Sequence, residues 1–204
     1  MKLHQAMTIA ERIQRELAPF CQKCEIAGSI RRGRPDVNDI DLVILPKAGQ
    51  LDAIKARCRQ RTRVITDGRQ NFIVALRMPD HSEFQLDIFF ARPGKEDLLD
   101  PQPTNFGSLL LCRTGSREHN ILICQAARQR DMKWNPYEGL LAGGEWVFKG
   151  QDIVYEGGRI IASETEEQIF EALGMKWIAP AYREVTSGAA LATVTQLDQP
   201  QVTS

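Results

Sequence analysis

The sequence predicts an α/β unit followed by a smaller α+β unit. In the first half, apolar runs typical of strands alternate with helical patterns, which favours a mixed sheet with flanking helices. Residues 91–105 are rich in Pro, Gly and charge, as in a linker. Helical patterns and Gly-punctuated apolar runs follow, which indicates helices beside a small antiparallel sheet. We therefore predict domains at residues 1–98 and 104–185, and a disordered tail at 186–204.

Composition excludes several classes of protein. The 204 residues have a formal net charge of zero and 43% hydrophobic content, which is ordinary for a globular protein. No apolar run approaches the roughly 18 residues of a membrane span, and the charged N-terminus does not resemble a signal peptide, so we expect an intracellular protein. Five scattered cysteines do not suggest a disulfide framework. The Cys21/Cys24 pair has no second pair with which to form a zinc site, although a metal or redox role stays open.

The first domain begins with a helical pattern at residues 3–18, where apolar residues recur at steps of three and four until Pro19. Alternation of period two then predicts paired strands. The other elements expected here are a strand near 25–27, a strand at 40–45, a helix at 51–61 and strands within 71–78 and 83–91.

The second domain should contain two helices, at residues 106–112 and 117–130, before the small sheet within 133–161. A last helix is expected at 163–174, because Ser163 is followed three residues later by Glu166, as in a capping box.

Three aspartates carry the chemical signal. Asp39 and Asp41 stand at i and i+2 before an apolar run, so their side chains leave the same face of a strand. Asp87 lies in a second strand, on the face away from the core. Converging carboxylates repel one another unless cations neutralise them, and hard oxygen ligands suit Mg²⁺ or Mn²⁺. Two such ions would clamp the attacking and leaving oxygens of a phosphoryl transfer.

The residues before this pair favour a phosphate. Gly28 and Ser29 form a turn that lets backbone N–H groups and a hydroxyl approach an anion closely. Arg31 and Arg32 add guanidinium donors. Each feature alone is weak, but G-S-x-R-R-G-x5-D-x-D before an apolar strand is a strong signal of triphosphate chemistry.

Other conspicuous residues have weaker interpretations. The basic stretch at 55–69 fits a solvated helix face and a backbone-phosphate contact surface equally well. His119 favours packing or capping over a ligand role. The three tryptophans suit core packing better than stacking on bases; they are Trp134, Trp146 and Trp177.

The motif GSIRRGRPDVNDIDLVI resembles the catalytic motif of the family X DNA polymerases, members of the polymerase-beta-like nucleotidyltransferase superfamily. QLDIFF resembles the strand that bears their third aspartate, and NFGSLLLCRTGSREHNI resembles their nucleotide-binding helix-turn-helix. Later blocks, KWNPYEGLL and ETEEQIFEALGMKWIAPAYRE, follow in the family's order. The resemblance spans residues 5–185 and implies a nucleotidyltransferase palm followed by a nucleotide-binding thumb subdomain.

The resemblance implies a role for each matched residue. Asp39 and Asp41 would bind both metals, and Asp87 would bind the catalytic metal and help to deprotonate the primer 3′-hydroxyl. Contacts to the incoming nucleotide would come from Gly28, Ser29, Arg32, Thr114, Gly115, Ser116, Arg117 and Asn120.

Departures from the family pattern matter as much. Cys112 and Arg113 replace a Tyr-Phe pair that lines the sugar, which suggests tolerance of ribonucleotides. Gln85 and Cys124 replace arginines, which puts template grip and fidelity in question. The lyase and helix-hairpin-helix domains of typical members have no counterpart in this sequence, so we expect a minimal form with low processivity.

The sequence therefore predicts a Mg²⁺-dependent, DNA-directed DNA polymerase that fills short gaps in DNA repair. Its expected partners are primer-template or gapped DNA and nucleoside triphosphates, with no membrane contact and a monomeric state. Two alternatives stay open, a template-independent nucleotidyltransferase acting on another acceptor and a non-catalytic DNA-binding protein.

Overall fold

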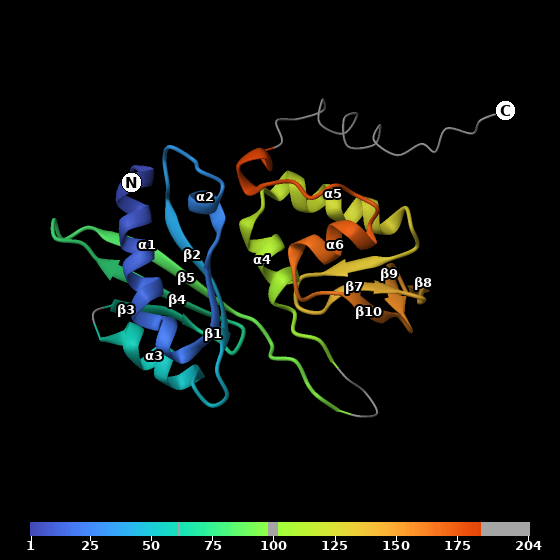
Figure 1. The fold of residues 1–204 in the computed structure, drawn as a ribbon, viewed down its shortest axis with the longest axis horizontal. Helices are drawn as coiled ribbons and strands as arrows, with labels where there is room; N and C mark the ends of the chain where they lie inside the picture. Colours follow the sequence, from blue (N-terminus) through green and yellow to red (C-terminus); the bar gives the residue numbers. More distant parts are fainter. Residues whose placement is uncertain (61, 98–101, 185–204) are drawn as a thin grey trace.

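The computed structural model describes residues 1–60, 62–97 and 102–184 (Figure 1). The predicted tail at 186–204 and part of the predicted linker lie outside these residues. In chain order the elements are α1 (Leu3–Leu17), η1 (Ala18–Phe20), β1 (Cys21–Ile26), α2 (Gly28–Arg31), β2 (Asp39–Pro46), α3 (Leu51–Arg59), β3 (Thr62–Asp67), β4 (Asn71–Arg77), β5 (Glu83–Phe90), α4 (Phe106–Thr114), α5 (Arg117–Arg128), β6 (Lys133–Asn135), β7 (Gly139–Ala142), β8 (Glu145–Lys149), β9 (Asp152–Glu156), β10 (Arg159–Ala162), α6 (Glu166–Ala172) and η2 (Pro180–Tyr182).

The first half of the chain forms a five-stranded mixed sheet in the order β1-β2-β5-β4-β3. Only the β2–β5 pair in this sheet is parallel; the other neighbours are antiparallel. Helices α1 and α3 lie along one side of the sheet in Figure 1. The predicted α/β class with flanking helices is confirmed.

Alternation along the strands separates the two faces of this sheet. One set of side chains packs with α1 and α3 in the main core, which includes Ala10, Leu42, Ile54, Phe72 and Ile88. The other set contains the aspartates and, further along the same strands, buried apolar residues. As predicted, Asp87 points away from the core-facing set.

Helix α4 covers the apolar end of the second face. Val43, Leu45 and Phe89 of the sheet pack with Phe106 and Leu109 of α4 in a separate cluster. Burial at about 25 cal/mol per Å² of apolar surface makes this contact a substantial attachment between the halves of the chain. It also leaves the aspartates beside the C-terminal end of α4.

A third core holds the second half together. Leu111, Ile123, Trp134, Leu140 and Phe170 pack between α4, α5, α6 and the strands β6 and β7. The predicted single sheet is instead two units, a three-stranded sheet β10-β7-β6 and a separate hairpin β8–β9. The positions of the domain boundaries stay a prediction.

Two local predictions are wrong. Helix α6 begins after Thr165, whose hydroxyl accepts from the backbone N–H of Gln168 in a reciprocal capping box, so the cap is not Ser163. Two boxes overlap in the sequence, and Ser163 instead donates to the carbonyl of Thr104. Trp177 is 43% exposed, contrary to the core prediction, whereas Trp134 is buried.

No helix in the described part of the chain is both long and apolar enough to cross a membrane.

Candidate active site

The three aspartates meet at the centre of the mixed sheet. The parallel register pairs Asp41 of β2 with Asp87 of β5, and it pairs Asp39 with Gln85. Residues opposite each other in neighbouring strands share a face, so all three carboxylates lie on the side that α4 leaves open. Gln85 donates from Nε2 to Oδ1 of Asp87 at 2.7 Å, which leaves Oδ2 of Asp87 for another ligand.

The electrostatics of these carboxylates reflect their crowding. Burial, with a smaller contribution from the charges of Asp39 and Asp87, raises the pKa of Asp41 to about 7, while Arg113 and Arg32 oppose the shift. Burial also raises the pKa of Asp87, against the hydrogen bond from Gln85. Mutual repulsion of this kind marks a site that a cation would relieve.

Gly28 allows Asp41 its position. A Cβ atom on Gly28 would lie 1.9 Å from Oδ2 of Asp41, and the glycine has a φ of +59° that other residues rarely adopt. The predicted Gly28-Ser29 turn forms the start of the single helical turn α2. The Ser29 hydroxyl next to it is buried and has no hydrogen-bond partner among the described residues. A buried, unpaired hydroxyl beside a carboxylate cluster fits a missing phosphate.

Arg31 does not face the aspartates, contrary to the expectation that it adds a phosphate donor. Its guanidinium donates to Oγ1 of Thr114 at 2.6 Å and to both carboxylate oxygens of Glu166 at 2.7 and 3.0 Å. Arg31 therefore joins the first half of the chain to the second.

Glu166 is the centre of this junction. Its side chain is 2% exposed, and Arg183, with no exposed side-chain surface, donates to the same two oxygens at 2.7 and 3.1 Å. Burial alone would raise the pKa of Glu166, but the hydrogen bonds and charges of Arg183 and Arg31 outweigh it and hold that pKa below its ordinary value. Sequence reasoning missed this triad, because Glu166 had been interpreted as a cap.

Arg32 also contacts the second half. Its Nε donates to Glu184 at 2.5 Å, and an Nη atom donates to the carbonyl of Thr114. The side chain is 14% exposed and lines the pocket described next. Arg32 thus lines that pocket while its charge acts on Asp41, and Glu184 holds its guanidinium in place.

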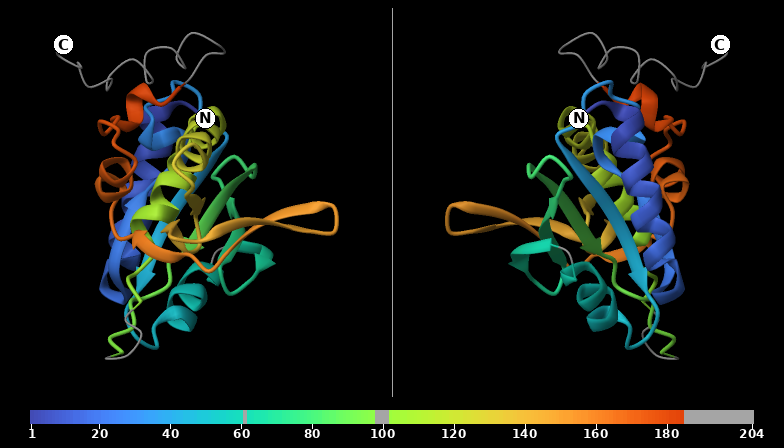
Figure 2. Two further views of the ribbon diagram at one scale, coloured as in Figure 1. Left: turned by 90° about the vertical axis from the view of Figure 1, so that its right-hand side faces the viewer. Right: turned by 90° about the vertical axis from the view of Figure 1, so that its left-hand side faces the viewer.

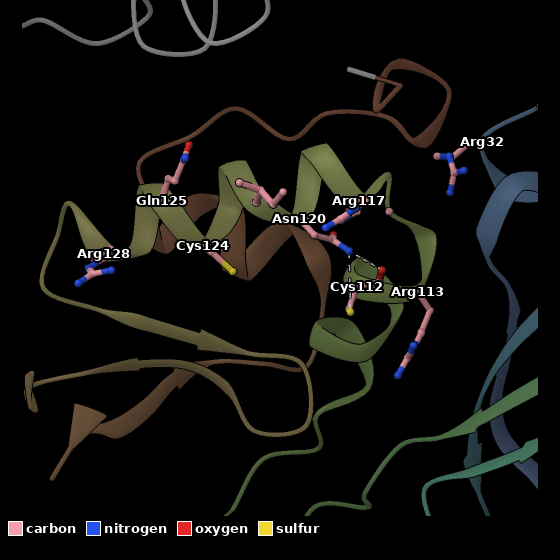
Figure 3. Close-up of a pocket in the computed structure, with 10 residues that line it drawn as sticks. Arg32, Cys112, Arg113, Arg117, Asn120, Cys124, Gln125 and Arg128 are labelled. Atoms are coloured by element: carbon pink, nitrogen blue, oxygen red, sulfur yellow. Dashed lines mark hydrogen bonds between the residues drawn. The ribbon is translucent and has the colours of Figure 1, made fainter. Parts of the chain in front are cut away.

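A pocket of about 580 Å³ lies along α5 (Figure 3). None of the three aspartates lines it, but Arg32 and Arg113, whose charges act on Asp41, do. Arg32 and Arg113 lie at one end of it, and Arg128 lies at the other. Its lining residues are Arg32, Cys112, Arg113, Gly115, Arg117, Asn120, Ile121, Cys124, Gln125 and Arg128. Most come from one stripe of α5 at helical spacing.

The predicted nucleotide contacts divide between this pocket and its support. Asn120 donates from Nδ2 to the carbonyl of Cys112 at 2.8 Å, and its buried Oδ1 lacks a partner within the described residues. Thr114 and Ser116 are buried and face away from it, toward Arg31 and the carbonyl of Arg183. Asn120 and Arg117 therefore line the pocket. Thr114 and Ser116 lie beneath it, hydrogen-bonded to Arg31 and to the carbonyl of Arg183.

His119 packs as predicted. It is buried, its ring centroid lies 5.8 Å from that of Phe170, and burial lowers its pKa to about 4. The neutral ring therefore belongs to the core of the second half.

Arg113 is the functional neighbour that sequence reasoning did not place. Its guanidinium carbon lies 3.8 Å from the centroid of the Phe89 ring, and it donates to the hydroxyl of Tyr137 at 2.7 Å. Its charge opposes the rise in the pKa of both Asp41 and Asp87. Phe89 stands two residues after Asp87 in β5, so an arginine stacked on Phe89 lies near Asp87.

The donor set fits a hard divalent cation, although the carboxylates do not enclose one. Within residues 1–60, 62–97 and 102–184, no group of three His, Cys, Asp or Glu side chains has the spacing to hold a metal ion. The chemistry of the site is nevertheless that of oxygen ligands, and the raised pKa of Asp41 shows that added positive charge is favoured there.

Comparisons with known proteins agree with this geometry. Residues 109–184 match the family model of the DNA polymerase beta thumb. No curated protein sequence matches the chain. The match covers 76 of the 204 residues and falls within the second half of the chain.

Two solved structures share the fold. Both are of Leishmania infantum polymerase beta, one in a ternary P/T complex and one in a ternary gap complex. The first matches with a TM-score of 0.65 at 17% identity, and the match covers 91% of this chain and 77% of the polymerase chain. The second has a TM-score of 0.64 at 16% identity and covers 91% and 71%. The chain therefore has the polymerase beta fold, and the resemblance to the family X polymerases is confirmed at that level.

Proposed function

We propose that this protein is a DNA-directed DNA polymerase, a nucleotidyltransferase that adds a nucleotide to a primer 3′-hydroxyl. The observation that carries the proposal is the parallel register that sets Asp41 opposite Asp87, with Gly28 beneath Asp41 and the unpaired Ser29 hydroxyl beside it. The polymerase beta fold and the thumb match support it.

The residues divide the work in a way that follows from their contacts. Asp39, Asp41 and Asp87 would hold two divalent ions, Mg²⁺ being our proposal, which would lower the pKa of the hydroxyl and stabilise charge on the transferred phosphorus. Oδ2 of Asp87 would accept the hydroxyl proton, since Gln85 already donates to Oδ1.

The triphosphate would take up the unused donors. The Ser29 hydroxyl and the backbone at Gly28 would donate to phosphate oxygens, and Arg32 would exchange Glu184 for phosphate. The pocket along α5 would hold the sugar and base, with Asn120 and Arg117 beside them. Such a preorganised set of donors stabilises the charge that develops during transfer.

Short gap filling during DNA repair inside the cell is the role that we propose, with primer-template or gapped DNA and nucleoside triphosphates as partners. One of the two structural neighbours is a gap complex, which supports this substrate. The proposed state of the protein is a monomer.

Extension of a labelled primer across a one-nucleotide gap tests the function. In Mg²⁺, with each dNTP supplied singly, we expect only the complementary nucleotide to be added. Asp87→Asn should reduce the rate by at least about a hundredfold, because it removes a ligand and the proton acceptor. Addition regardless of the template would favour a template-independent transferase. Retained DNA binding without any addition would favour a non-catalytic protein.

We further propose that ribonucleotides are tolerated. Cys112 lines the pocket with a small side chain, and Arg113 at its end is held by Phe89 and Tyr137. We expect kcat/KM for a dNTP and the matching NTP to agree within about tenfold, and Cys112→Tyr to increase the discrimination by about tenfold or more. A discrimination of a thousandfold in the unaltered protein would contradict the idea.

A further inference from the structure

The hairpin β8–β9 projects from the second half of the molecule. Figure 2 shows it extending well beyond the helices, on the same side as strands β3 and β4 of the mixed sheet. Its register pairs Trp146 with Tyr155 and Phe148 with Ile153. Phe148 is 79% exposed and Ile153 is 45% exposed, so this cross-strand apolar pair presents its surface to solvent.

The two faces of this hairpin differ in chemistry. Opposite residues and residues two apart share a face, so Trp146, Tyr155, Phe148 and Ile153 form one uncharged aromatic face. The opposite face contains the charged residues Glu145, Lys149, Asp152 and Glu156. A polyanion would therefore meet acidic side chains on one face only, and stacking surfaces on the other.

The aromatic face continues the nucleotide pocket. Arg128 lies at the far end of that pocket (Figure 3). Its guanidinium carbon is 5.2 Å from the centroid of the Trp146 ring. Trp146 meets Tyr155 edge to face at 5.1 Å, and Phe148 follows on the same face. The order from the pocket outward is a cation, a packed aromatic pair and an exposed aromatic ring.

We propose that the aromatic face of the β8–β9 hairpin is a platform for single-stranded nucleic acid, the unpaired template that leaves the pocket. Arg128 contacts a backbone phosphate and Phe148 stacks on a base. Grooves that bind single strands combine cations with such aromatic surfaces. The proposal rests on the proposed function, which supplies an unpaired template at the pocket.

A second copy of this chain is a poorer fit. A stable interface buries about 800 Å² on each partner, whereas one Phe and one Ile expose on the order of 250 Å². Charge complementarity also favours nucleic acid, since the pocket that leads to the hairpin contains Arg32, Arg117 and Arg128.

Equilibrium binding to two primer-templates tests the platform. One has a single unpaired template nucleotide and the other has about ten unpaired thymidines, and fluorescence anisotropy gives both affinities for the full chain. We expect the longer overhang to bind at least about fivefold more tightly, and Phe148→Ala to remove most of that preference. Affinity for the short overhang should not change.

Matched variants separate stacking from other causes. Phe148→Tyr should keep the preference and Phe148→Leu should lose it, because a base stacks on a ring and not on a branched chain. Val147→Ala truncates the opposite face of the same hairpin and should have no effect. An unchanged preference in Phe148→Ala would overturn the platform, as would a dimer that Phe148→Ala dissociates with the overhang preference intact.

Single-nucleotide extension on the short overhang distinguishes this proposal from the proposed function. Extension at the normal rate by Phe148→Ala, with the overhang preference lost, is the expected result. Normal extension by a variant whose preference is unaltered would reject the platform alone. Overhang preference that depends on Phe148, without extension by any variant, would reject the proposed polymerase activity alone.

Discussion

Asp41 is held in a position that costs stability and that its chemistry requires. Asp41 is half-buried against Gly28, and any side chain at position 28 would clash with its carboxylate. Two other carboxylates share its face of the sheet. Burial and those charges together raise its pKa to about 7. An acid whose pKa is raised on folding destabilises the folded state as pH rises above the ordinary value of 3.8, and the full penalty is present above pH 7.

Asp41→Asn should therefore stabilise the protein while abolishing activity. At pH 8 in metal-free buffer we expect the free energy of unfolding to rise by about 2–4 kcal/mol, since each pKa unit corresponds to about 1.4 kcal/mol. At pH 4 the difference should nearly vanish. Chemical denaturation at both pH values measures it, and Asp152→Asn, on the exposed hairpin, is the control. Equal stability of the variant and the unaltered protein at pH 8 would refute this account of the site.

At the level of elements, α4 depends on a glycine for its contact with α6. A Cβ atom on Gly107 would lie 2.2–2.3 Å from backbone atoms of Thr165, the residue that caps α6. The backbone cannot move away like a flexible side chain, because the carbonyl of Ser163 accepts from the N–H of Ser108. The two helices are therefore locked at this point.

Gly107→Ala sets helix propensity against this contact. Alanine favours a helix interior over glycine by about 1 kcal/mol, but overpacking against backbone costs about 1–3 kcal/mol and loosens the cap as well. We expect a net loss of about 1–2 kcal/mol in unfolding free energy. A variant with Gly107→Ala that is more stable than the unaltered protein would show that the helices can separate freely.

The elements that carry the aspartates could be predicted from sequence because they follow local rules. Strand β2 contains a compact apolar run, β5 alternates apolar and polar residues over most of its length, and α1 has a helical stripe that ends at a proline. The site also has a dense local motif at 28–41. What lies between distant segments could not be predicted in this way. Arg31 looked like a phosphate donor until the fold brought Glu166, 135 residues later, within reach.

The same limit explains the misplaced cap and the hairpin. Ser163 and Thr165 each begin a capping pattern, and only the packing of α4 against the turn selects Thr165. Trp146 and Trp177 have apolar neighbours in sequence, yet one packs beside Arg128 and the other is partly exposed beside Arg183. Burial is a property of the assembled chain, so composition near a residue does not determine it.

Across the whole molecule, a buried charge triad joins the two halves. Glu166 receives two hydrogen bonds from Arg183, which is fully buried, and two from Arg31, which is 22% exposed on its side chain. Removing one partner of a buried ion pair leaves an uncompensated charge, which is more costly than the pair is stabilising. The outer arginine should matter less than the inner one.

Arg183→Met should thus lower the unfolding free energy by about 3 kcal/mol, and Arg31→Met by about 1–2 kcal/mol. Because the pKa of Glu166 is held below its ordinary value, the triad stabilises the protein above pH 4.5 and its contribution declines as pH falls below that. Urea denaturation at pH 7 and at pH 3.5 measures both effects. A double-mutant cycle with Glu166→Gln isolates each pair, and additive effects for Arg183 and Glu166 would contradict the triad.

The position of Arg183 and Glu184 near the end of the described chain has a consequence for synthesis. Both residues leave the ribosome after the complete mixed sheet and the α5 pocket have emerged, yet they supply the contacts that hold Arg32 and Glu166 across the two halves. While the chain is being synthesised, the sheet that contains the aspartates therefore exists before Arg183 and Glu184 can make these contacts. The contacts that join the face of the sheet containing the aspartates to the pocket along α5 therefore form only after both of those parts have been synthesised.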